Sequence, residues 1–475
     1  MTRWKENNDN MITFCVSLVL LVVGALVYSR YVEKVFGVEP ERRTPCYSQE
    51  DGVDYVPMPT WKVFLIQFLN IAGTGPIFGA IMGILFGPAA YLWIVFGCLF
   101  AGGVHDYLSG MISLRKGGVS LPEMVGDELG SVARIVMRIF SVTLLVLVGT
   151  VFVVTPADLL GNMTAGSFAT PLFWTCIIFV YYLLATLLPI SSLIGRVYPV
   201  FGIALLVMAL GVGVNIVVNP GWMPEVTDGL SSHHPGGLPV FPMLCITIAC
   251  GAISGFHGTQ NPLMARCMTN ERDGRRVFYW AMVAEGIVAL IWAAAAIKFF
   301  GDYGTLGNAG TPGVIVNKIC SSWMGVVGAA LAVLGVVAAP VTSGDTAFRS
   351  ARLIVSDMFK MKKGGACNRV LVTLPMFAVS VLLMFLDFNV LWRYFAWCNQ
   401  TLATITLWAS AVWLVRQSRS CWMAVLPAVF MTVVCVCYII VAPEGFLLPY
   451  WIGLVSGIVV SIVVSILFFV WKSKR

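Results

Sequence analysis

The sequence has few charged residues. Only 11% of its 475 residues are Asp, Glu, Lys or Arg, whereas soluble proteins carry about 25%. Hydrophobic residues make up 59%, which is too many for a water-facing surface on a chain of this length. This composition excludes a soluble enzyme, a nucleic-acid-binding protein and a disordered chain. It predicts an all-α polytopic membrane protein.

Closely spaced cysteines are also scarce. The thirteen cysteines are scattered through apolar runs without a CxxC motif, and Cys435 and Cys437 form the one close pair. This pattern favours buried small hydrophobic side chains over a metal or disulfide framework.

Long apolar runs, in contrast, are abundant. A bilayer core about 30 Å thick needs about 20 apolar residues per helix, and about thirteen such runs can be placed. The first follows Arg3 and Lys5, as in a secretory signal, but it lacks a small-residue cleavage site, so we expect a retained helix. The runs lie near 12–29, 62–86, 88–114, 132–155, 172–190, 196–218, 239–265, 276–301, 323–345, 370–387, 391–415, 421–441 and 447–471.

Positive charge is distributed unevenly over the connections between these runs. An odd number of spans places the termini on opposite sides, and Lys and Arg collect on the cytoplasmic side. Of the 30 Lys and Arg, 25 fall on the face that includes the C-terminus. We therefore expect an outside N-terminus and a cytoplasmic C-terminus. The connections on the basic face are 30–62, 115–138, the turn at Arg196, 266–276, 349–369, the turn at 416–419 and the tail 472–475.

Two predicted spans are interrupted by glycine and proline. NIAGTGPIFGAIMG (70–83) lies inside the second span and ISGFHGTQNP (253–262) inside the seventh. Close packing of small residues is one explanation. However, the breaks lie five spans apart, so the two helices enter the membrane from opposite sides, as the first members of two inverted five-helix sets. Interrupted helices at corresponding places in two halves point to the binding site of a secondary transporter.

This pattern predicts a LeuT-like 5+5 inverted repeat with two broken helices. Its predicted parts are 1–61, an extra transmembrane helix and cytoplasmic loop; 62–218, the first repeat (spans 2–6); 219–415, an outer loop and the second repeat (spans 7–11); and 416–475, two further helices and a basic tail.

Unwound backbone at bilayer depth offers amides to an anion and carbonyls to a cation. We expect a substrate carboxylate to lie at a half-helix N-terminus between the two breaks. The predicted substrate-binding residues are Gly73, Thr74, Gly75, Pro76, Ser254, Gly255, His257 and Gln260.

Few ionisable residues lie inside the spans, and such residues are functional candidates because they are costly to insert. For proton or ion coupling we select His105, Asp106, Glu285, Thr342, Ser343 and Asp345. Structural alternatives are an Asp345–Arg349 ion pair near the cytoplasmic end of span 9, a satisfied buried acid at Glu285, and bonds from Thr342 and Ser343 to the preceding helical turn.

Span 11 contains two adjacent amides, Asn399 and Gln400. They line a path or join helices, and the second role is favoured. No cofactor is expected. A zinc site from His105 and His257 with a carboxylate is a minor hypothesis, because imidazole and carboxylate suit that ion.

Several motifs resemble the carbon starvation protein A (CstA) family of prokaryotic inner-membrane transporters. They are DGVDYVP (51–57), IAGTGPIFGAIMG (71–83), GGVHDYLSGMISLRKGGVSLPE (102–123), CGAISGFHGTQNPLMARC (250–267), RRVFYWAMVAEGIVALIWAAAA (275–296) and PVTSGDTAFRSARLIVSD (340–357). This chain departs from longer family members in having one span before the core where two are expected, and in reading IAGTGPIFGA where they tend towards IAGAGPIVGP.

The resemblance implies a LeuT-like fold and uptake of pyruvate or peptides during carbon starvation, with pyruvate coupled to protons. It makes spans 2 and 7 the broken core helices. It places Thr342 and Ser343 where sodium-coupled relatives supply hydroxyls to a cation.

The sequence as a whole predicts a secondary-active importer of a small carboxylate-bearing nutrient in the cell inner membrane, coupled to H+ or alternatively to Na+. A nutrient sensor and an intramembrane hydrolase built on Asp106 and Asp345 are weaker alternatives. The bilayer and a small-molecule substrate are the expected partners, nucleic acid is not, and the oligomeric state stays open.

Overall fold

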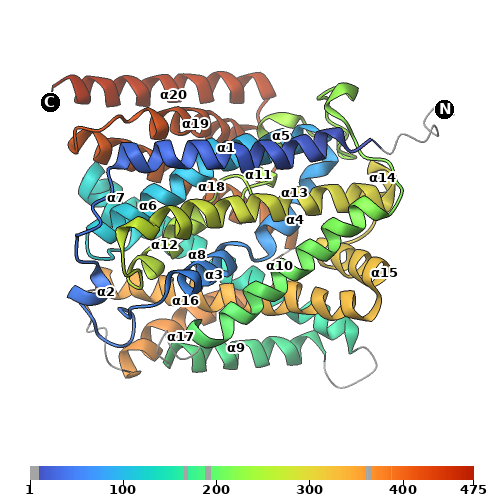
Figure 1. Cartoon of the computed structure of the whole chain (residues 1–475), viewed down its shortest axis with the longest axis horizontal. Coiled ribbons are helices and arrows are strands. Elements are labelled where there is room, and N and C mark those ends of the chain that lie inside the picture. The colour runs from blue at the N-terminus through green and yellow to red at the C-terminus, as the bar shows by residue number, and fades with distance from the viewer. Residues whose placement is uncertain are drawn as a thin grey trace.

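The computed structural model describes residues 10–164, 170–187, 194–359, 361, 366–386 and 388–474. These residues form helices joined by loops, with one isolated bridge between Met58 and Met268 and no strand among them. Many of the longer helices run roughly along the long axis of the molecule (Figure 1). The prediction of an all-α protein is confirmed.

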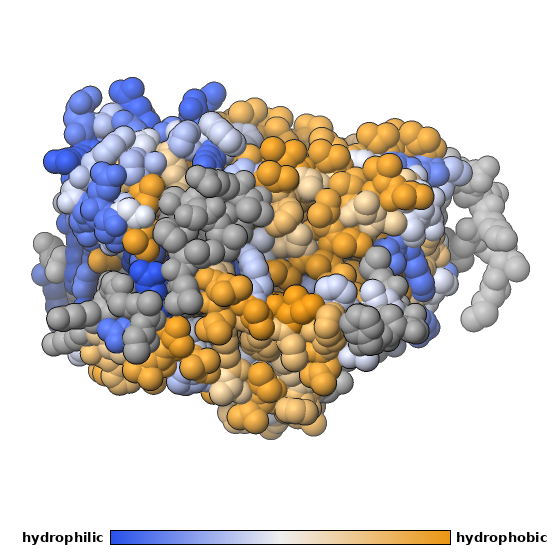
Figure 2. All heavy atoms as spheres, turned by 90° about the horizontal axis from the view of Figure 1, so that it is seen from below, coloured by the Kyte–Doolittle hydropathy of each residue, from blue (hydrophilic) through white to orange (hydrophobic). Residues whose placement is uncertain are grey.

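The surface is that of a membrane protein. Eight helices in the described part of the chain are long and apolar enough to cross a membrane, and the bent pair α3 (Thr60–Ile71) and α4 (Thr74–Gly83) is a ninth candidate. Figure 2 shows a wide hydrophobic belt between hydrophilic residues at the two ends of the long axis. Both observations indicate a multi-pass membrane protein.

Each of the thirteen predicted spans overlaps one or two helices, although the number of membrane crossings and the inverted repeat stay predictions. The remaining helices are α1 (Ile12–Phe36), α2 (Pro45–Ser48), α5 (Ala89–Phe96), α6 (Gly103–Arg115), α7 (Leu121–Leu129), α8 (Ser131–Met163), α9 (Pro171–Leu187), α10 (Ile194–Val218), α11 (Val240–Thr247), α12 (Gly255–Ala265), α13 (Trp280–Phe300), α14 (Tyr303–Gly307), α15 (Pro312–Val333), α16 (Ala339–Met358), α17 (Ala366–Leu383), α18 (Phe388–Arg416), α19 (Trp422–Val441) and α20 (Tyr450–Ser473).

The predicted limits of span 9, 323–345, are wrong at the C-terminal end. The helix breaks at Gly325 (φ 59°, ψ −143°) and then continues through a π-helical turn into α16, which ends at Met358. Thr342, Ser343 and Asp345 therefore lie well inside a helix and not near its end. The sequence obscured this continuation because α16 contains many polar side chains, which lower its mean hydropathy. In the structure these side chains are buried against protein.

The connections predicted on the basic face do meet. Arg115 Nη2 donates to the Gly37 carbonyl at 2.6 Å, and Glu271 Oε2 accepts from the Glu39 amide at 2.7 Å. Arg416 Nη1 forms a 2.8 Å ion pair with Glu128. The C-terminal ends of α1 and α20 lie on the same side of the molecule (Figure 1). These contacts join four predicted basic connections at one end of the molecule. That this end is cytoplasmic stays a prediction, and residues 1–9 lie outside the described residues.

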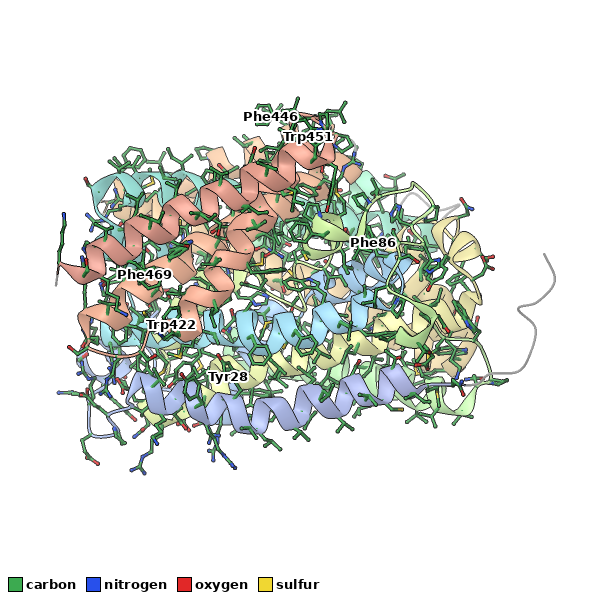
Figure 3. The ribbon with its side chains drawn as sticks, turned by 90° about the horizontal axis from the view of Figure 1, so that it is seen from above. Tyr28, Phe86, Trp422, Phe446, Trp451 and Phe469 are labelled. Atoms are coloured by element: carbon green, nitrogen blue, oxygen red, sulfur yellow. The ribbon has the colours of Figure 1, made fainter. Side chains whose placement is uncertain are left out.

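Aromatic side chains mark both ends of the outer helices. Phe446 and Trp451 project from the surface where α20 begins, whereas Trp422 and Phe469 lie towards its other end (Figure 3). Trp451 is 65% exposed and Trp422 is 50% exposed. Aromatic rings at two such levels are typical of anchors at the membrane–water interfaces.

Both predicted helix breaks are present. The first separates α3 from α4 at residues 72–73 and bends the pair by 46°. The second separates α11 from α12 over residues 248–254, where Gly251 has a φ of 95°. The two breaks pack directly together, since a Cβ atom on Gly75 would lie 2.5 Å from Cys250 Cβ and one on Gly79 would lie 2.9 Å from the Thr247 carbonyl oxygen.

We predict that Gly79→Ala lowers stability, because the added methyl group would meet the backbone carbonyl of Thr247, the last residue of α11 before the second break. Overpacking of this kind costs about 1–3 kcal/mol. The measurement is the melting temperature of the purified protein in detergent. Gly213→Ala in α10 is the control, since its added Cβ would lie 3.6 Å from Ile291 in ordinary contact. Equal melting temperatures for both variants would contradict the tight packing of the two breaks.

Candidate functional site

A fully buried network of histidines and carboxylates lies beside the second break. Asp106 of α6 is at its centre: Oδ1 is 2.8 Å from His105 Nδ1, and Oδ2 is 2.9 Å from His257 Nδ1 in the first turn of α12. All three side chains are 0% exposed. The structure thus brings together three of the predicted site residues, two of them from one helix and one from the interrupted segment.

The network continues to Glu285 of α13. His257 Nε2 is 3.4 Å from Glu285 Oε2, and Glu285 is also fully buried. When Asp106 is ionised and His257 Nδ1 donates to it, Nε2 of a neutral ring presents a lone pair to the Glu285 oxygen. Two acceptors do not face each other without repulsion, so the pair is stable when one proton lies between the imidazole and the carboxyl group.

Amides that the sequence-based selection omitted hold this network in place. Asn261 Nδ2 donates to Ser109 Oγ at 2.7 Å and to the Asp106 carbonyl at 3.1 Å. Its Oδ1 accepts from Gln67 Nε2 of α3 at 2.6 Å. The sequence feature that could have identified Asn261 is the polar NP dipeptide within an apolar span. Through Asn261 the network is connected to the first broken helix.

Polar groups also gather at the first break. Ser343 Oγ donates to the Leu69 carbonyl at 3.2 Å, so this residue contacts the end of α3 beside the first break. Thr342 instead donates to the Ala339 carbonyl in the preceding turn. Asn70, which sequence reasoning did not select, is fully buried, and both of its amide atoms and Thr74 Oγ1 lack a hydrogen-bond partner among the described residues. Such atoms are suited to a polar ligand at this break.

The second break is held by the two amides of α18. Asn399 Oδ1 accepts from the Phe256 amide at 2.6 Å and from Ser254 Oγ at 3.1 Å, which caps the start of α12. Gln400 Nε2 donates to the Cys245 carbonyl in the last turn of α11 at 3.2 Å. These contacts match the helix-joining role. Lining of a path by these residues stays a prediction.

The other selected residues lie around the breaks. Gln260 accepts a hydrogen bond of 3.5 Å from Ser350 of α16, which connects α12 to that helix. A Cβ atom on Gly255 would lie 2.4 Å from the Asn399 carbonyl oxygen, so α12 and α18 are in close backbone contact. Pro76 lies beside Gly251 in the packed breaks, and Asp345 is buried in α16.

The His105 and His257 rings approach the same carboxylate, that of Asp106, and zinc binding by these two histidines stays a prediction. Among the residues that the structure describes, one group has metal-ligating atoms close together: those of Cys250, His257 and Glu285 lie within 4.8 Å of one another. A thiolate, an imidazole and a carboxylate are a donor set that suits zinc. Metal analysis of the purified protein tests zinc binding at either group.

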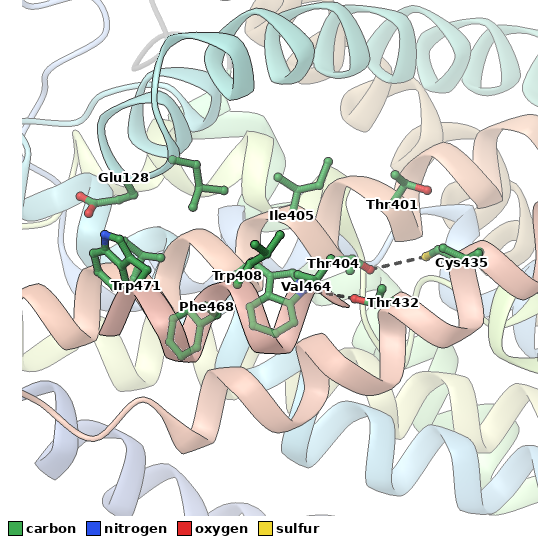
Figure 4. A pocket seen from close by; sticks show the side chains of 14 residues that line it. Glu128, Thr401, Thr404, Ile405, Trp408, Thr432, Cys435, Val464, Phe468 and Trp471 are labelled. Carbon is green, nitrogen blue, oxygen red and sulfur yellow. Dashed lines mark hydrogen bonds between the residues drawn. The ribbon is translucent and has the colours of Figure 1, made fainter. Parts of the chain in front are cut away.

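A cavity of about 540 Å³ lies away from both breaks, between α18, α19 and α20. Trp408, Thr404 and Thr432 line its middle, and Trp471 lies at one end near Glu128 (Figure 4). Its lining is mainly apolar and includes none of the predicted substrate residues. Cavity size alone would therefore have pointed to a different place from the breaks and the buried charges.

Comparisons with known proteins agree with these features. The sequence model of the family described as "Carbon starvation protein CstA" matches residues 9–173, 163–319 and 305–437. An uncharacterized membrane protein of Haemophilus influenzae is 41% identical over 65% of this chain and 95% of its own length.

Two named relatives are transporters. The pyruvate/proton symporter BtsT of Escherichia coli is 31% identical over 59% of this chain and 48% of its own length. The peptide transporter CstA of Bacillus subtilis is 31% identical over 60% of this chain and 58% of its own length. The chain thus spans about half the length of these named relatives.

Solved structures show the fold. A manganese transporter of Eremococcus coleocola superimposes with a TM-score of 0.54 at 15% identity, covering 89% of this chain and 98% of that one. MhsT in complex with L-phenylalanine has the same TM-score and identity, with 84% and 97% covered. These similarities confirm the predicted LeuT-like fold class.

We predict that Asn399→Leu destabilises the protein, because this near-isosteric change leaves the Phe256 amide and Ser254 hydroxyl buried without their acceptor. An unsatisfied buried group costs about 1–3 kcal/mol. Thermal unfolding in detergent measures the effect. Asn215→Leu is the control, since Asn215 donates to a carbonyl of its own helix, Gly211. A melting temperature of Asn399→Leu at or above that of the control would rule out a capping role.

Proposed function

Because the chain belongs to the carbon starvation protein CstA family, we propose that it is a secondary-active transporter that imports a small carboxylate-bearing nutrient together with protons. Pyruvate and short peptides are the substrates proposed from its named relatives. The substrate lies between the two breaks, near Gly73–Pro76 and Ser254–Gln260. The cell inner membrane is the proposed location.

One observation carries the proton coupling: the His257 imidazole lies between the Asp106 and Glu285 carboxyl groups inside the protein. His257 is also in the first turn of a broken helix. Loss of the proton between His257 and Glu285 would leave two acceptors facing each other, which weakens the contact between α12 and α13. Protonation and the position of the helix that faces the substrate are thereby linked, as a symporter requires.

Sodium coupling is the second candidate, and the position of Ser343 favours it. The Ser343 hydroxyl and the Leu69 carbonyl lie 3.2 Å apart at the first break, and oxygen atoms of this kind are ligands for a hard cation. In the present arrangement the hydroxyl donates to the carbonyl. A sodium ion would have to replace that hydrogen bond.

A sensor and a hydrolase have less support. Both Asp106 oxygens are bonded to histidines, whereas a hydrolytic acid dyad shares a proton between two carboxyl groups. The named relatives are transporters.

We predict that Glu285→Gln uncouples transport. A glutamine amide donates permanently to His257 Nε2 and so imitates the protonated state. In proteoliposomes, exchange of labelled pyruvate or dialanine across the membrane should persist, whereas accumulation driven by an inward proton gradient should fall by about tenfold or more. Glu33→Gln, at a partly exposed ion pair with Arg275 outside the network, should accumulate substrate as the wild type does.

Accumulation by Glu285→Gln at the wild-type level under the same gradient would refute the coupling site. If the wild type instead accumulates substrate in response to a sodium gradient at constant pH, the coupling ion is sodium and the coupling site is at the first break.

The orientation gives a separate prediction. A green fluorescent protein fused after Arg475 should fluoresce in cells, and an alkaline phosphatase fused at the same place should be inactive, because the 25 basic residues on that face favour the cytoplasm. An inactive green fluorescent protein and an active alkaline phosphatase would show that the C-terminus lies outside the cytoplasm.

A further inference from the structure

The cavity of about 540 Å³ between α18, α19 and α20 is elongated in the direction of these helices. Glu128 and Trp471 lie at one end of it, and Thr401 and Cys435 lie at the other (Figure 4). Along α18 the lining extends from Val412 to Thr401, which is roughly 16 Å at about 1.5 Å per residue. The shape is that of a space for an extended chain.

The cavity begins at the basic end of the molecule and reaches deep into the protein. Trp471 lies in the last turn of α20, directly before the basic tail. Cys435 lies roughly 20 Å along α19 from its first residue, Trp422, at about 1.5 Å per residue. A bilayer with its head-group regions is about 40–45 Å thick, so this depth is that of one leaflet.

Most polar groups in the wall are bonded to protein. Trp408 Nε1 donates to Thr432 Oγ1 at 3.1 Å, and the hydroxyl groups of Thr404 and Thr432 donate to carbonyls of their own helices at 2.8 and 2.7 Å. Thr401 Oγ1 is an exception, since it has no hydrogen-bond partner among the described residues. Except at the Glu128 end, the remaining lining is apolar. A pyruvate ion would lose its hydration there without a partner in return.

The cavity opens towards the membrane. Leu467 of α20 and Leu129 at the end of α7 both line it, and they are 64% and 38% exposed. The helix that carries Leu467 is a candidate membrane span that is mostly exposed. The molecules that meet this opening in a bilayer are lipids.

Positive charge is available beside the basic end of the cavity. Glu128, the acid that lines it, is already paired with Lys116 at 2.7 Å and with Arg416 at 2.8 Å. Lys472 follows Trp471 directly, and among the described residues no acid forms an ion pair with it. Lysine side chains just outside a membrane span attract anionic lipids.

We propose that this cavity binds one acyl chain of an anionic phospholipid and that Lys472 binds its phosphate group. The wall supplies an apolar space of one leaflet's depth, and the lysine lies at the level of that leaflet's head groups. This site does not depend on the proposed transport function. Thr404 in its wall bonds to the Gln400 carbonyl, so a bound chain also packs against the part of α18 that holds the second break.

The first test is native mass spectrometry of the purified protein with phosphatidylglycerol, or with phosphatidylcholine of the same acyl chains. The wild type should retain phosphatidylglycerol about fivefold better, which is the effect of one lysine on an anionic lipid. Lys472→Gln should lose this preference. Lys34→Gln is the control, since Lys34 is exposed in the last turn of α1 at the same end of the molecule, and it should keep the preference.

The second test fills the cavity. Val464→Phe enlarges a side chain of the wall, so this variant should retain either lipid several-fold less well than the wild type. Val463→Phe is the control, because Val463 is the neighbouring residue of α20 and is 49% exposed on its outer side. Melting temperatures without added lipid separate the loss of the site from a folding defect.

Equal lipid retention by Val464→Phe and Val463→Phe would refute the acyl-chain site, and an unchanged preference in Lys472→Gln would refute the head-group contact. If inorganic phosphate raises the melting temperature as much as phosphatidylglycerol does, the site binds a free anion and the lipid proposal is wrong. A wild-type dimer that Val464→Phe separates would show that a second copy of the chain covers the cavity, which also overturns the proposal.

Discussion

The structure depends on the need to satisfy backbone groups where two helices are interrupted inside a membrane. Lipid offers them no hydrogen-bond partner, so protein must supply every one. Asn399 and Gln400, adjacent on α18, bond to the two free ends on either side of the second break. Ser343 bonds to a carbonyl at the end of α3 beside the first. The glycines then let the two interrupted segments touch, so that each break excludes lipid from the other.

The same constraint decides where charge is tolerated. Asp106, His257 and Glu285 are fully buried, and isolated ions would be too costly there. The His105 and His257 rings around the Asp106 carboxylate reduce that cost, but only while the helices α6, α12 and α13 keep their mutual positions. A buried network of this kind is therefore stable in one arrangement for each protonation state, which is the property that a coupled transporter needs.

Much of this could be predicted from sequence because glycine, proline and buried polar residues are local signals. Runs 70–83 and 253–262 located both breaks, and the small number of ionisable residues selected Asp106, His257 and Glu285. Which residues contact one another in the folded protein is not a local property of the sequence. Nothing in the sequence shows that both histidines contact Asp106, that Cys250 lies near His257 and Glu285, or that Asn70 has no hydrogen-bond partner among the described residues. The C-terminal end of α16 was missed because a hydropathy scan detects helices that face lipid, whereas α16 is covered by other parts of the protein.

The short helix α12 contacts both the buried proton network and α16, and these contacts suggest how the two act together. His257 faces the carboxyl groups of α6 and α13, and Gln260, one turn later, contacts Ser350 of α16 between Ser343 and Arg352. A rotation of α12 that accommodates a change in the His257–Glu285 proton also moves Gln260 against α16. A single short helix then transmits the state of the proton to α16, whose Ser343 contacts the end of α3 beside the first break.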